Sequence, residues 1–249
     1  MASAQSLHIV YGGTFDPVHL GHVAIAESAY AALRAAGLEP ERFDFLPNAD
    51  PPHRAAPGAA AGHRVAMLWL ALTSRPQFGI DLRELRRGGP SYMVETLESL
   101  RAELGAEAPL VLMMGEDAWR GFARWQRWQD IPALAHVLVV NRPHASDPSP
   151  RPGPAEAEAE SETLASHASP PALAACVRER AGALIDLGRA PAGRIVFMEL
   201  PPHPASATVV REAVSQGDYD ALAALVSPEV SAYIARHRLY LPSEAAPGA

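Results

Sequence analysis

The sequence predicts an α/β protein built on a doubly wound parallel sheet, with a helical C-terminal part. Short apolar runs alternate along the chain with longer segments whose apolar residues recur at helical spacing. Three of these runs end in glycine-rich or polar turns, and an open parallel sheet binds ligands at the carboxyl ends of its strands. The predicted strands are Leu7–Tyr11, Arg42–Leu46, Phe78–Ile80, Leu110–Met114, His136–Asn141 and Arg194–Leu200.

Helical segments follow most of these strands. The first helix is predicted to begin near His19, and helical spacing returns over Val65–Leu72. Ser91 is a suitable N-cap for a helix that continues to Leu104, and Ser206 for one near the C-terminal end. Two more helices are predicted at Tyr219–Leu225 and Pro228–Arg236.

The segment GGTFDPVHLGH, residues 12–22, joins the first predicted strand to the first helix. Gly12 and Gly13 let backbone N–H groups approach a ligand closely. His19 and His22 share one face of the first helical turn, where unpaired N–H groups and the positive end of the helix dipole favour anions. The segment has neither the P-loop pattern nor the G-x-G-x-x-G pattern of dinucleotide-binding folds. We therefore predict a phosphate site formed by imidazoles and backbone groups.

Composition excludes several classes of protein. A net charge of −7 and a pI near 5.8 argue against a nucleic-acid partner. The single cysteine, Cys176, excludes an internal disulfide framework and a cysteine-based zinc site. The chain starts without a basic and apolar leader and has no apolar stretch of about 20 residues, so we expect a cytoplasmic protein without a membrane partner.

One domain is expected over residues 1–249, interrupted by an insert and followed by a tail. From about 144 to 190 the composition changes to Pro, Ala, Ser and Glu, which predicts a low-complexity insert whose end, Leu173–Leu187, is able to form a helix. Residues 242–249 are expected to form a mobile tail.

Three strand-end turns are predicted to meet in one cleft: residues 12–22, 115–117 and 206–211. His19, His22 and Arg211 would surround a polyphosphate, and Thr208, three residues before Arg211, would add a hydroxyl donor. Asp117 is predicted either to accept hydrogen bonds from ribose hydroxyls or to cap its own helix. At least one of Trp119, Trp125 and Trp128 is expected in the core.

Together with the first segment, the strings PNADPPHR, RELRRGGPSYMVETL, MGED, the Trp125 region and SATVVR closely resemble bacterial nicotinate-nucleotide adenylyltransferases. The resemblance runs from about Leu7 to Tyr240, without the insert. The first and last motifs mark the wider superfamily of nucleotidyltransferases with an H-x-G-H signature and a Rossmann-like fold, and the middle motifs are more specific. The resemblance implies transfer of the adenylyl group of ATP to nicotinic acid mononucleotide, with release of pyrophosphate.

The resemblance also implies roles for individual residues. His19, His22, Thr208 and Arg211 would bind the ATP phosphates and stabilise charge during transfer. The residues implied to line the adenosine and phosphate site, with Ser206 as the helix cap, are Gly12, Gly13, Thr14, Phe15, Gly115, Asp117 and Ser206. Those implied to bind the acceptor are Asn48, His53, Arg54, Tyr92, Met93, Trp125, Gln126 and Arg142, with Trp125 stacking on the pyridine ring.

Two positions depart from the family pattern: Met93 replaces a usual Thr, and Gln126 replaces a frequent aromatic residue. These departures keep three alternatives open: nicotinamide mononucleotide as acceptor, phosphopantetheine as acceptor, or a nucleotide sensor without catalysis. Mg²⁺ is expected to arrive with ATP, and no separate metal site is predicted. The sequence leaves open whether the chain forms a homo-oligomer.

Overall fold

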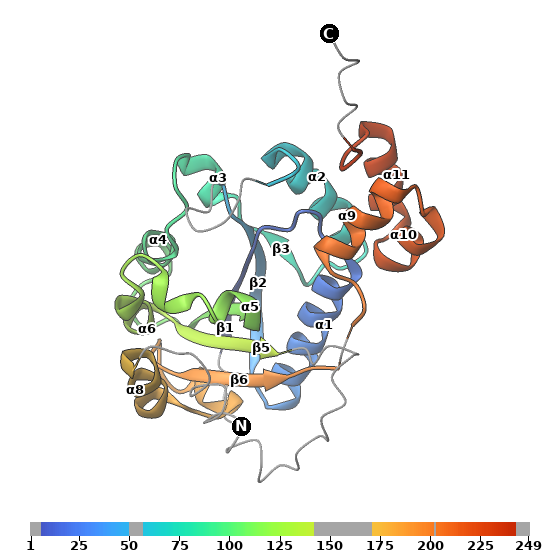
Figure 1. The fold of residues 1–249 in the computed structure, drawn as a ribbon. Helices are drawn as coiled ribbons and strands as arrows, with labels where there is room; N and C mark the ends of the chain where they lie inside the picture. The colour runs from blue at the N-terminus through green and yellow to red at the C-terminus, as the bar shows by residue number, and fades with distance from the viewer. Residues whose placement is uncertain (1–5, 50–56, 142–170, 202, 243–249) are drawn as a thin grey trace.

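In the computed structural model, described for residues 6–49, 57–141, 171–201 and 203–242, the core is one parallel sheet with the strand order β3-β2-β1-β4-β5-β6 (Figure 1). The sheet confirms the predicted fold class. The strands are β1 (Ser6–Gly13), β2 (Glu39–Pro47), β3 (Gly79–Ile80), β4 (Leu110–Gly115), β5 (His136–Asn141) and β6 (Ile195–Glu199). Val10 of β1 pairs with Asp44 on one side and Leu112 on the other. The strand order therefore reverses between β1 and β4, which is where such sheets bind ligands.

Helices connect and cover the strands. The longer ones are α1 (Leu20–Ala35), α2 (Ala61–Leu72), α4 (Met93–Leu104), α8 (Pro171–Arg180), α9 (Ala207–Gln216), α10 (Tyr219–Leu225) and α11 (Pro228–His237). The short ones are α3 (Arg83–Arg87), α5 (Glu116–Trp119), η1 (Phe122–Arg124), η2 (Trp128–Asp130), α6 (Ile131–Leu134) and η3 (Leu184–Gly188). Each predicted helix outside the insert is present, with its ends within a few residues of the expected positions.

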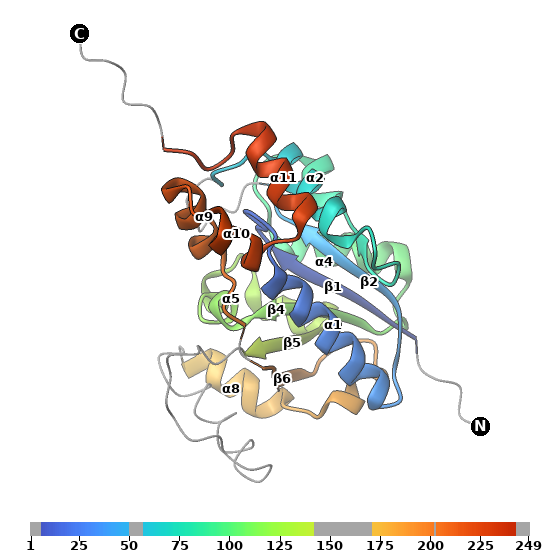
Figure 2. The same ribbon diagram turned by 90° about the vertical axis from the view of Figure 1, so that its right-hand side faces the viewer.

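Each face of the sheet has its own hydrophobic core, because alternate side chains of a strand point to opposite faces. Ile9 and Tyr11 pack with α1, α2 and the C-terminal helices, whereas Val10 packs with α4, Trp119 and α8. Figure 2 shows α1 lying along the first of these faces, with α10 and α11 beyond it. The C-terminal helices thus close one end of the first core.

The end of the insert is more regular than its composition suggests. Leu173, Val177 and Leu187 are buried in the two cores. The single helix predicted over Leu173–Leu187 is wrong, because Ala181 forms a bridge to Ile195 and the Gly182 N–H donates to the Ile195 carbonyl, which ends α8. Residues 142–170 and 243–249 lie outside the described part of the chain, so the rest of the insert and most of the tail stay predictions, as does the single-domain organisation.

The start of α4 also corrects a prediction. Its N-cap is Tyr92, and the Ser91 hydroxyl accepts a hydrogen bond from the Ala49 backbone N–H at 2.8 Å instead of capping the helix. Ser206 and Ser227 do cap their helices, by accepting from the N–H groups of Val209 and Val230. Within the described ranges, no helix is long and apolar enough to cross a membrane.

Candidate active site

A cleft of about 870 Å³ opens at the carboxyl ends of β1 and β4. The three predicted turns meet there, which confirms that they form one cleft. The predicted site residues that line it are Gly12, Gly13, Thr14, Phe15, His19, His22, Asn48, Tyr92, Met93, Gly115, Asp117, Trp125, Gln126, Ser206, Thr208 and Arg211. His53, Arg54 and Arg142 lie outside the described residues.

The two histidines lie against each other at the N-terminus of α1. His19 is the N-cap residue, and its ring centroid lies 3.7 Å from that of His22. The His19 backbone N–H donates to Nδ1 of His22 at 3.3 Å, which places the ring proton of a neutral His22 on Nε2. The His22 ring also packs against the edge of Phe15, with the centroids 5.0 Å apart. The backbone and a buried aromatic ring therefore fix the orientation of His22.

The glycine pair has a packing role besides the predicted approach to a ligand. A Cβ atom on Gly13 would lie within 2.7 Å of the Phe15 ring. Phe15 has a φ of 49°, in the left-handed region that is costly for a bulky residue, and it is 2% exposed. Gly13 thus allows the chain to fold back over itself and bury Phe15 under the phosphate turn.

Arg211 and Thr208 reach the same turn from α9. Nη1 of Arg211 donates to the Asp16 carbonyl at 2.6 Å, and Nη2 donates to the Thr208 hydroxyl at 3.4 Å. Thr208 is exposed and Arg211 is partly exposed, so both can reach a ligand in the cleft. The spacing of three residues places them side by side, as the sequence predicts.

Two buried charged residues support the site, and the sequence analysis did not identify either. The Asp16 carboxylate, 7% exposed, accepts from the N–H groups of Gly58 and Ala59 and from the Tyr240 hydroxyl at 2.6, 3.1 and 2.7 Å. Burial and the Asp16 carboxylate both raise the pKa of Tyr240, so its hydroxyl remains a donor. Asp16 therefore joins the phosphate turn to the loop before α2 and to the C-terminal segment.

Arg64, 1% exposed, is the other unpredicted residue. Its guanidinium donates to the Thr14 carbonyl at 2.6 Å and to the Asn48 carbonyl at 2.8 Å, which links the turns after β1 and β2. A basic residue at a core position of an amphipathic helix was a signal for this role, because Arg is rarely buried without partners.

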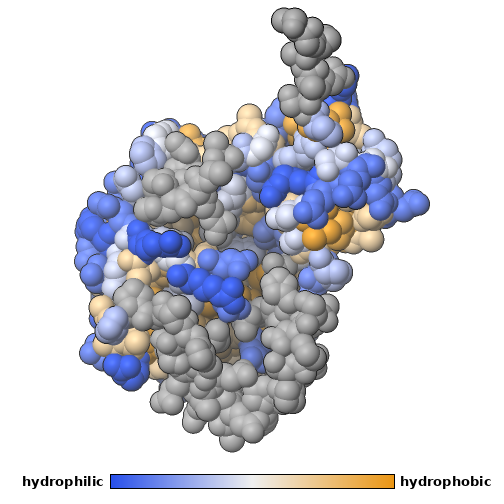
Figure 3. Space-filling view, viewed as in Figure 1, coloured by the Kyte–Doolittle hydropathy of each residue, from blue (hydrophilic) through white to orange (hydrophobic). Residues whose placement is uncertain are grey.

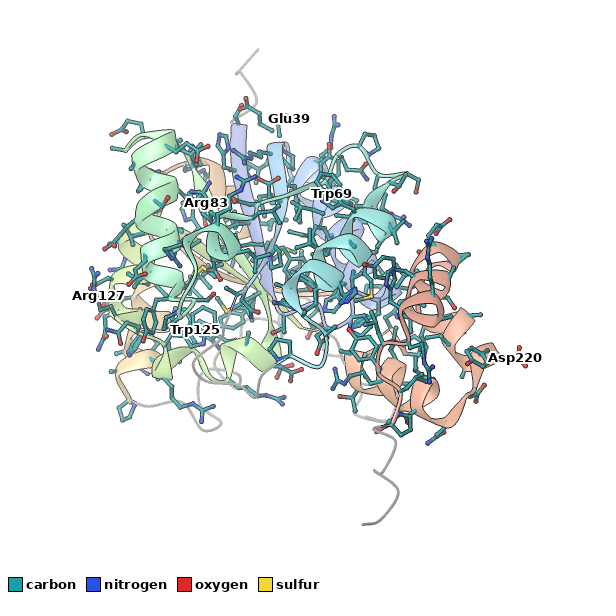
Figure 4. The ribbon with its side chains drawn as sticks, turned by 90° about the horizontal axis from the view of Figure 1, so that it is seen from above. Glu39, Trp69, Arg83, Trp125, Arg127 and Asp220 are labelled. Carbon is teal, nitrogen blue, oxygen red and sulfur yellow. The ribbon has the colours of Figure 1, made fainter. Side chains whose placement is uncertain are left out.

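The other end of the cleft is formed by Tyr92, Met93, Trp125 and Gln126. Trp119 and Trp128 are buried in the core, whereas Trp125 is only partly buried and borders the cleft. In Figure 4, Trp125 lies on the same side of the molecule as Arg83 and Arg127, and Asp220 lies on the opposite side with the C-terminal helices. The structure thus gives the cleft an aromatic end and a cationic end.

Charged residues surround the opening of the cleft. Asp117 is highly exposed and lies 3.8 Å from Arg120, and it does not cap α5. Arg120 and Arg124 also line the cleft, and the sequence analysis assigned them no role. Hydrophilic residues gather near the middle of the face shown in Figure 3. Among the described residues, no group of three or more His, Cys, Asp or Glu side chains is placed to hold a metal ion.

The fold and this paired-histidine site define a nucleotidyltransferase. Residues 10–213 match the family model described as cytidylyltransferase-like. The chain is 38% identical over 240 residues to the probable nicotinate-nucleotide adenylyltransferase of Xylella fastidiosa (strain 9a5c), covering 94% of this chain and 96% of that relative. It is 41% identical over 250 residues to the protein of the same name from Stenotrophomonas maltophilia (strain K279a), covering 95% and 97%. The chain therefore belongs to the nicotinate-nucleotide adenylyltransferase family.

Solved structures agree on the fold. The nicotinic acid mononucleotide adenylyltransferase of Plasmodium falciparum, complexed with NaAD, superposes with a TM-score of 0.61. Its sequence identity is 13%, and the match covers 95% of this chain and 97% of that one. The match supports the nucleotidyltransferase architecture.

Proposed function

We propose that this chain transfers the adenylyl group of ATP to nicotinic acid mononucleotide, giving nicotinic acid adenine dinucleotide and pyrophosphate. The observation that carries the proposal is the arrangement of one cleft, with His19, His22, Thr208 and Arg211 at one end and Trp125 beside the start of α4 at the other. ATP would occupy the first end and the acceptor the second. The phosphates of the two nucleotides would then meet near the histidine pair.

The reaction requires alignment and charge stabilisation more than proton transfer. The acceptor phosphate is already an anionic nucleophile, so it attacks the α-phosphorus directly and pyrophosphate leaves in line. Holding two substrates in this geometry is able to lower the barrier by roughly 7–11 kcal/mol. The fixed His22 ring, the α1 N-terminus and Arg211 would stabilise the charge that develops on the phosphoryl oxygens. No covalent intermediate on the protein is required.

The acceptor would be recognised by stacking and by backbone amides. Trp125 would stack on the pyridine ring, and N–H groups near Met93 and Gln126 would receive its carboxylate. Met93 is the first residue of α4, whose first-turn N–H groups have no partners within the helix. Recognition by the backbone would tolerate the Met93 and Gln126 departures, because neither changes an N–H group.

Magnesium would be bound by the ATP phosphates. Mg²⁺ usually keeps several waters and bridges phosphates, which is compatible with the absence of a cluster of metal-ligating side chains among the described residues. When bound, the ion would neutralise phosphate charge. Thr208 and Arg211 would then hold the terminal phosphates, and the cytoplasm remains the expected location.

The decisive experiment measures pyrophosphate release from MgATP with nicotinic acid mononucleotide, nicotinamide mononucleotide and phosphopantetheine offered separately. We expect a strong preference for the first. Preference for the amide would move the acceptor assignment and indicate that Met93 or Gln126 alters the pocket. ATP binding without turnover on any acceptor would support the sensor alternative.

A further inference from the structure

Glu84 is a buried carboxylate at the acceptor end of the cleft, and the proposed reaction gives it no role. It lies on α3, lines the cleft and is only 2% exposed. Burying a carboxylate is costly unless hydrogen bonds replace its water. Burial raises the pKa of Glu84, whereas hydrogen bonds from Thr96 and Ser91 and the nearby Arg87 oppose that rise.

The Glu84 carboxylate joins two parts of the α3–α4 region. Thr96, buried within α4, donates its hydroxyl to Oε1 of Glu84 at 2.8 Å and accepts from Nη2 of Arg87 at 3.1 Å. Ser91, just before α4, donates its hydroxyl to the same carboxylate. Two separate oxygens are therefore needed to anchor the helix and the segment that leads into it.

The hydrogen bonds continue from Ser91 to the turn after β2. The Ala49 backbone N–H donates to Oγ of Ser91 at 2.8 Å. Because the Ser91 hydroxyl donates to Glu84, its oxygen is oriented to accept from Ala49. The sequence Ala49 N–H, Ser91 hydroxyl, Glu84 carboxylate is thus a directed chain of hydrogen bonds, and its charged end is the fixed point.

The same turn is held from its other side by Arg64. The guanidinium donates to the carbonyls of Asn48 and Ala49 at 2.8 and 3.4 Å, and the Asn48 side chain donates to the Thr14 hydroxyl at 3.0 Å. Arg64 thereby ties the turn to the nucleotide side of the cleft. Glu84 ties it to the side formed by Ser91, Tyr92 and Met93.

We propose that Glu84 is a positioning residue for the acceptor nucleotide, acting through Ser91 to fix Asn48 and Ala49 against the N-terminus of α4. The inference rests on the proposed function for the identity of the acceptor. A carboxylate suits this role better than an amide, because its two oxygens accept from two hydroxyls at once. Loss of one of these bonds would let the Asn48–Ala49 turn shift relative to Met93.

The test compares steady-state kinetics of Glu84→Gln and Ser91→Ala with those of the wild type, varying each substrate in turn. We expect each variant to raise the KM for nicotinic acid mononucleotide roughly tenfold, a loss typical of one charge-assisted hydrogen bond. The KM for ATP and kcat should stay within about twofold. The double variant should be little worse than the more affected single variant, because both substitutions break one chain of bonds.

Glu103→Gln is the matched control. Glu103 is a carboxylate on α4 that pairs with Arg42 and Arg83 and does not line the cleft. Its KM values should match those of the wild type. Additive losses, or equal changes in both KM values, would overturn the proposal and leave Glu84 a general structural residue.

Wild-type turnover with nicotinic acid mononucleotide tests the proposed function separately. If the wild type uses another acceptor, the same comparison is made with that acceptor, and its result keeps its meaning for Glu84. If the wild type turns over no acceptor, titration with nicotinic acid mononucleotide replaces kinetics. Unchanged affinity in the variants, or no binding by the wild type, would then refute the proposal. If Glu84→Gln does not fold, as judged by circular dichroism, Ser91→Ala alone carries the comparison.

Discussion

At the scale of single residues, His22 is the side chain whose chemistry depends most directly on its fixed orientation. Its Nδ1 accepts from the His19 backbone, and Phe15 supports the ring. We expect His22→Ala to lower kcat by roughly 10²–10³-fold, the loss typical of removing one preorganised donor to a developing oxyanion. Pyrophosphate release measures kcat, and calorimetric titration with ATP should show a smaller loss of affinity. Equal losses in both would contradict a role in the transition state.

Trp125 offers a separate test of the acceptor end. Stacking of an aromatic side chain on a base contributes about 1–3 kcal/mol, so Trp125→Ala should raise the KM for the acceptor by roughly ten- to a hundredfold. Trp125→Phe should keep part of that affinity. Trp69→Ala is the control, since Trp69 is 56% exposed on α2 and does not line the cleft. An unchanged acceptor KM in Trp125→Ala would contradict stacking.

At the scale of the elements, Arg101 connects α4 to two distant loops. Its guanidinium donates to the carbonyls of Ala108, Leu134 and Pro191 at 2.6, 2.7 and 2.7 Å. Arg101→Ala would leave these carbonyls without the donor, so we expect a loss of about 3 kcal/mol in the free energy of unfolding. Urea denaturation measures this loss.

Two further variants complete the Arg101 experiment. Arg101→Lys should recover only part of the loss, because one ammonium cannot match the planar geometry of the guanidinium. Arg189→Ala removes an exposed guanidinium that pairs with Asp186, and it should change the free energy of unfolding by less than about 1 kcal/mol. Similar losses for Arg101→Ala and Arg189→Ala would refute the connecting role.

Element by element, the sequence predicts best where local patterns and tertiary packing agree. The strand at Leu110 and the helix after Ser206 follow directly from an apolar run and a capping residue. Ser91 was misassigned because its hydroxyl bonds to a residue 42 positions away, which no local pattern reveals. Asp16 and Arg64 were missed for the same reason. Their partners are backbone groups that come near them only when the turns assemble.

At the scale of the whole molecule, the site depends on segments from both ends of the chain. The Tyr240 hydroxyl reaches the Asp16 carboxylate, and Arg211 reaches the Asp16 carbonyl. Two separate parts of the C-terminal region therefore converge on the turn that carries the histidines. The phosphate site forms only when the first core, which α9, α10 and α11 complete, is closed.

The far end of the sheet has its own fixed point in His136. The His136 residue, 0% exposed, donates from Nε2 to the Ala190 carbonyl at 2.8 Å and accepts at Nδ1 from the Arg194 N–H at 3.0 Å. This pattern requires a neutral ring, because a protonated Nδ1 cannot accept. Burial is the main cause that lowers the pKa of His136. Protonation would break the contact that aligns the start of β6 with β5.

The stability of the molecule should therefore fall as the pH falls below the ordinary histidine pKa of about 6.5. Because the folded state has the lower pKa, the contribution of His136 is fully present above pH 6.5 and is lost as the pH falls toward the folded value. Urea denaturation between about pH 7.5 and 5 should show this loss in the wild type and a flatter profile in His136→Gln. Burial raises the pKa of Glu84 and Asp44, which acts in the opposite direction in both proteins. The difference between the two profiles therefore isolates His136, and parallel profiles would show that its protonation is not linked to unfolding.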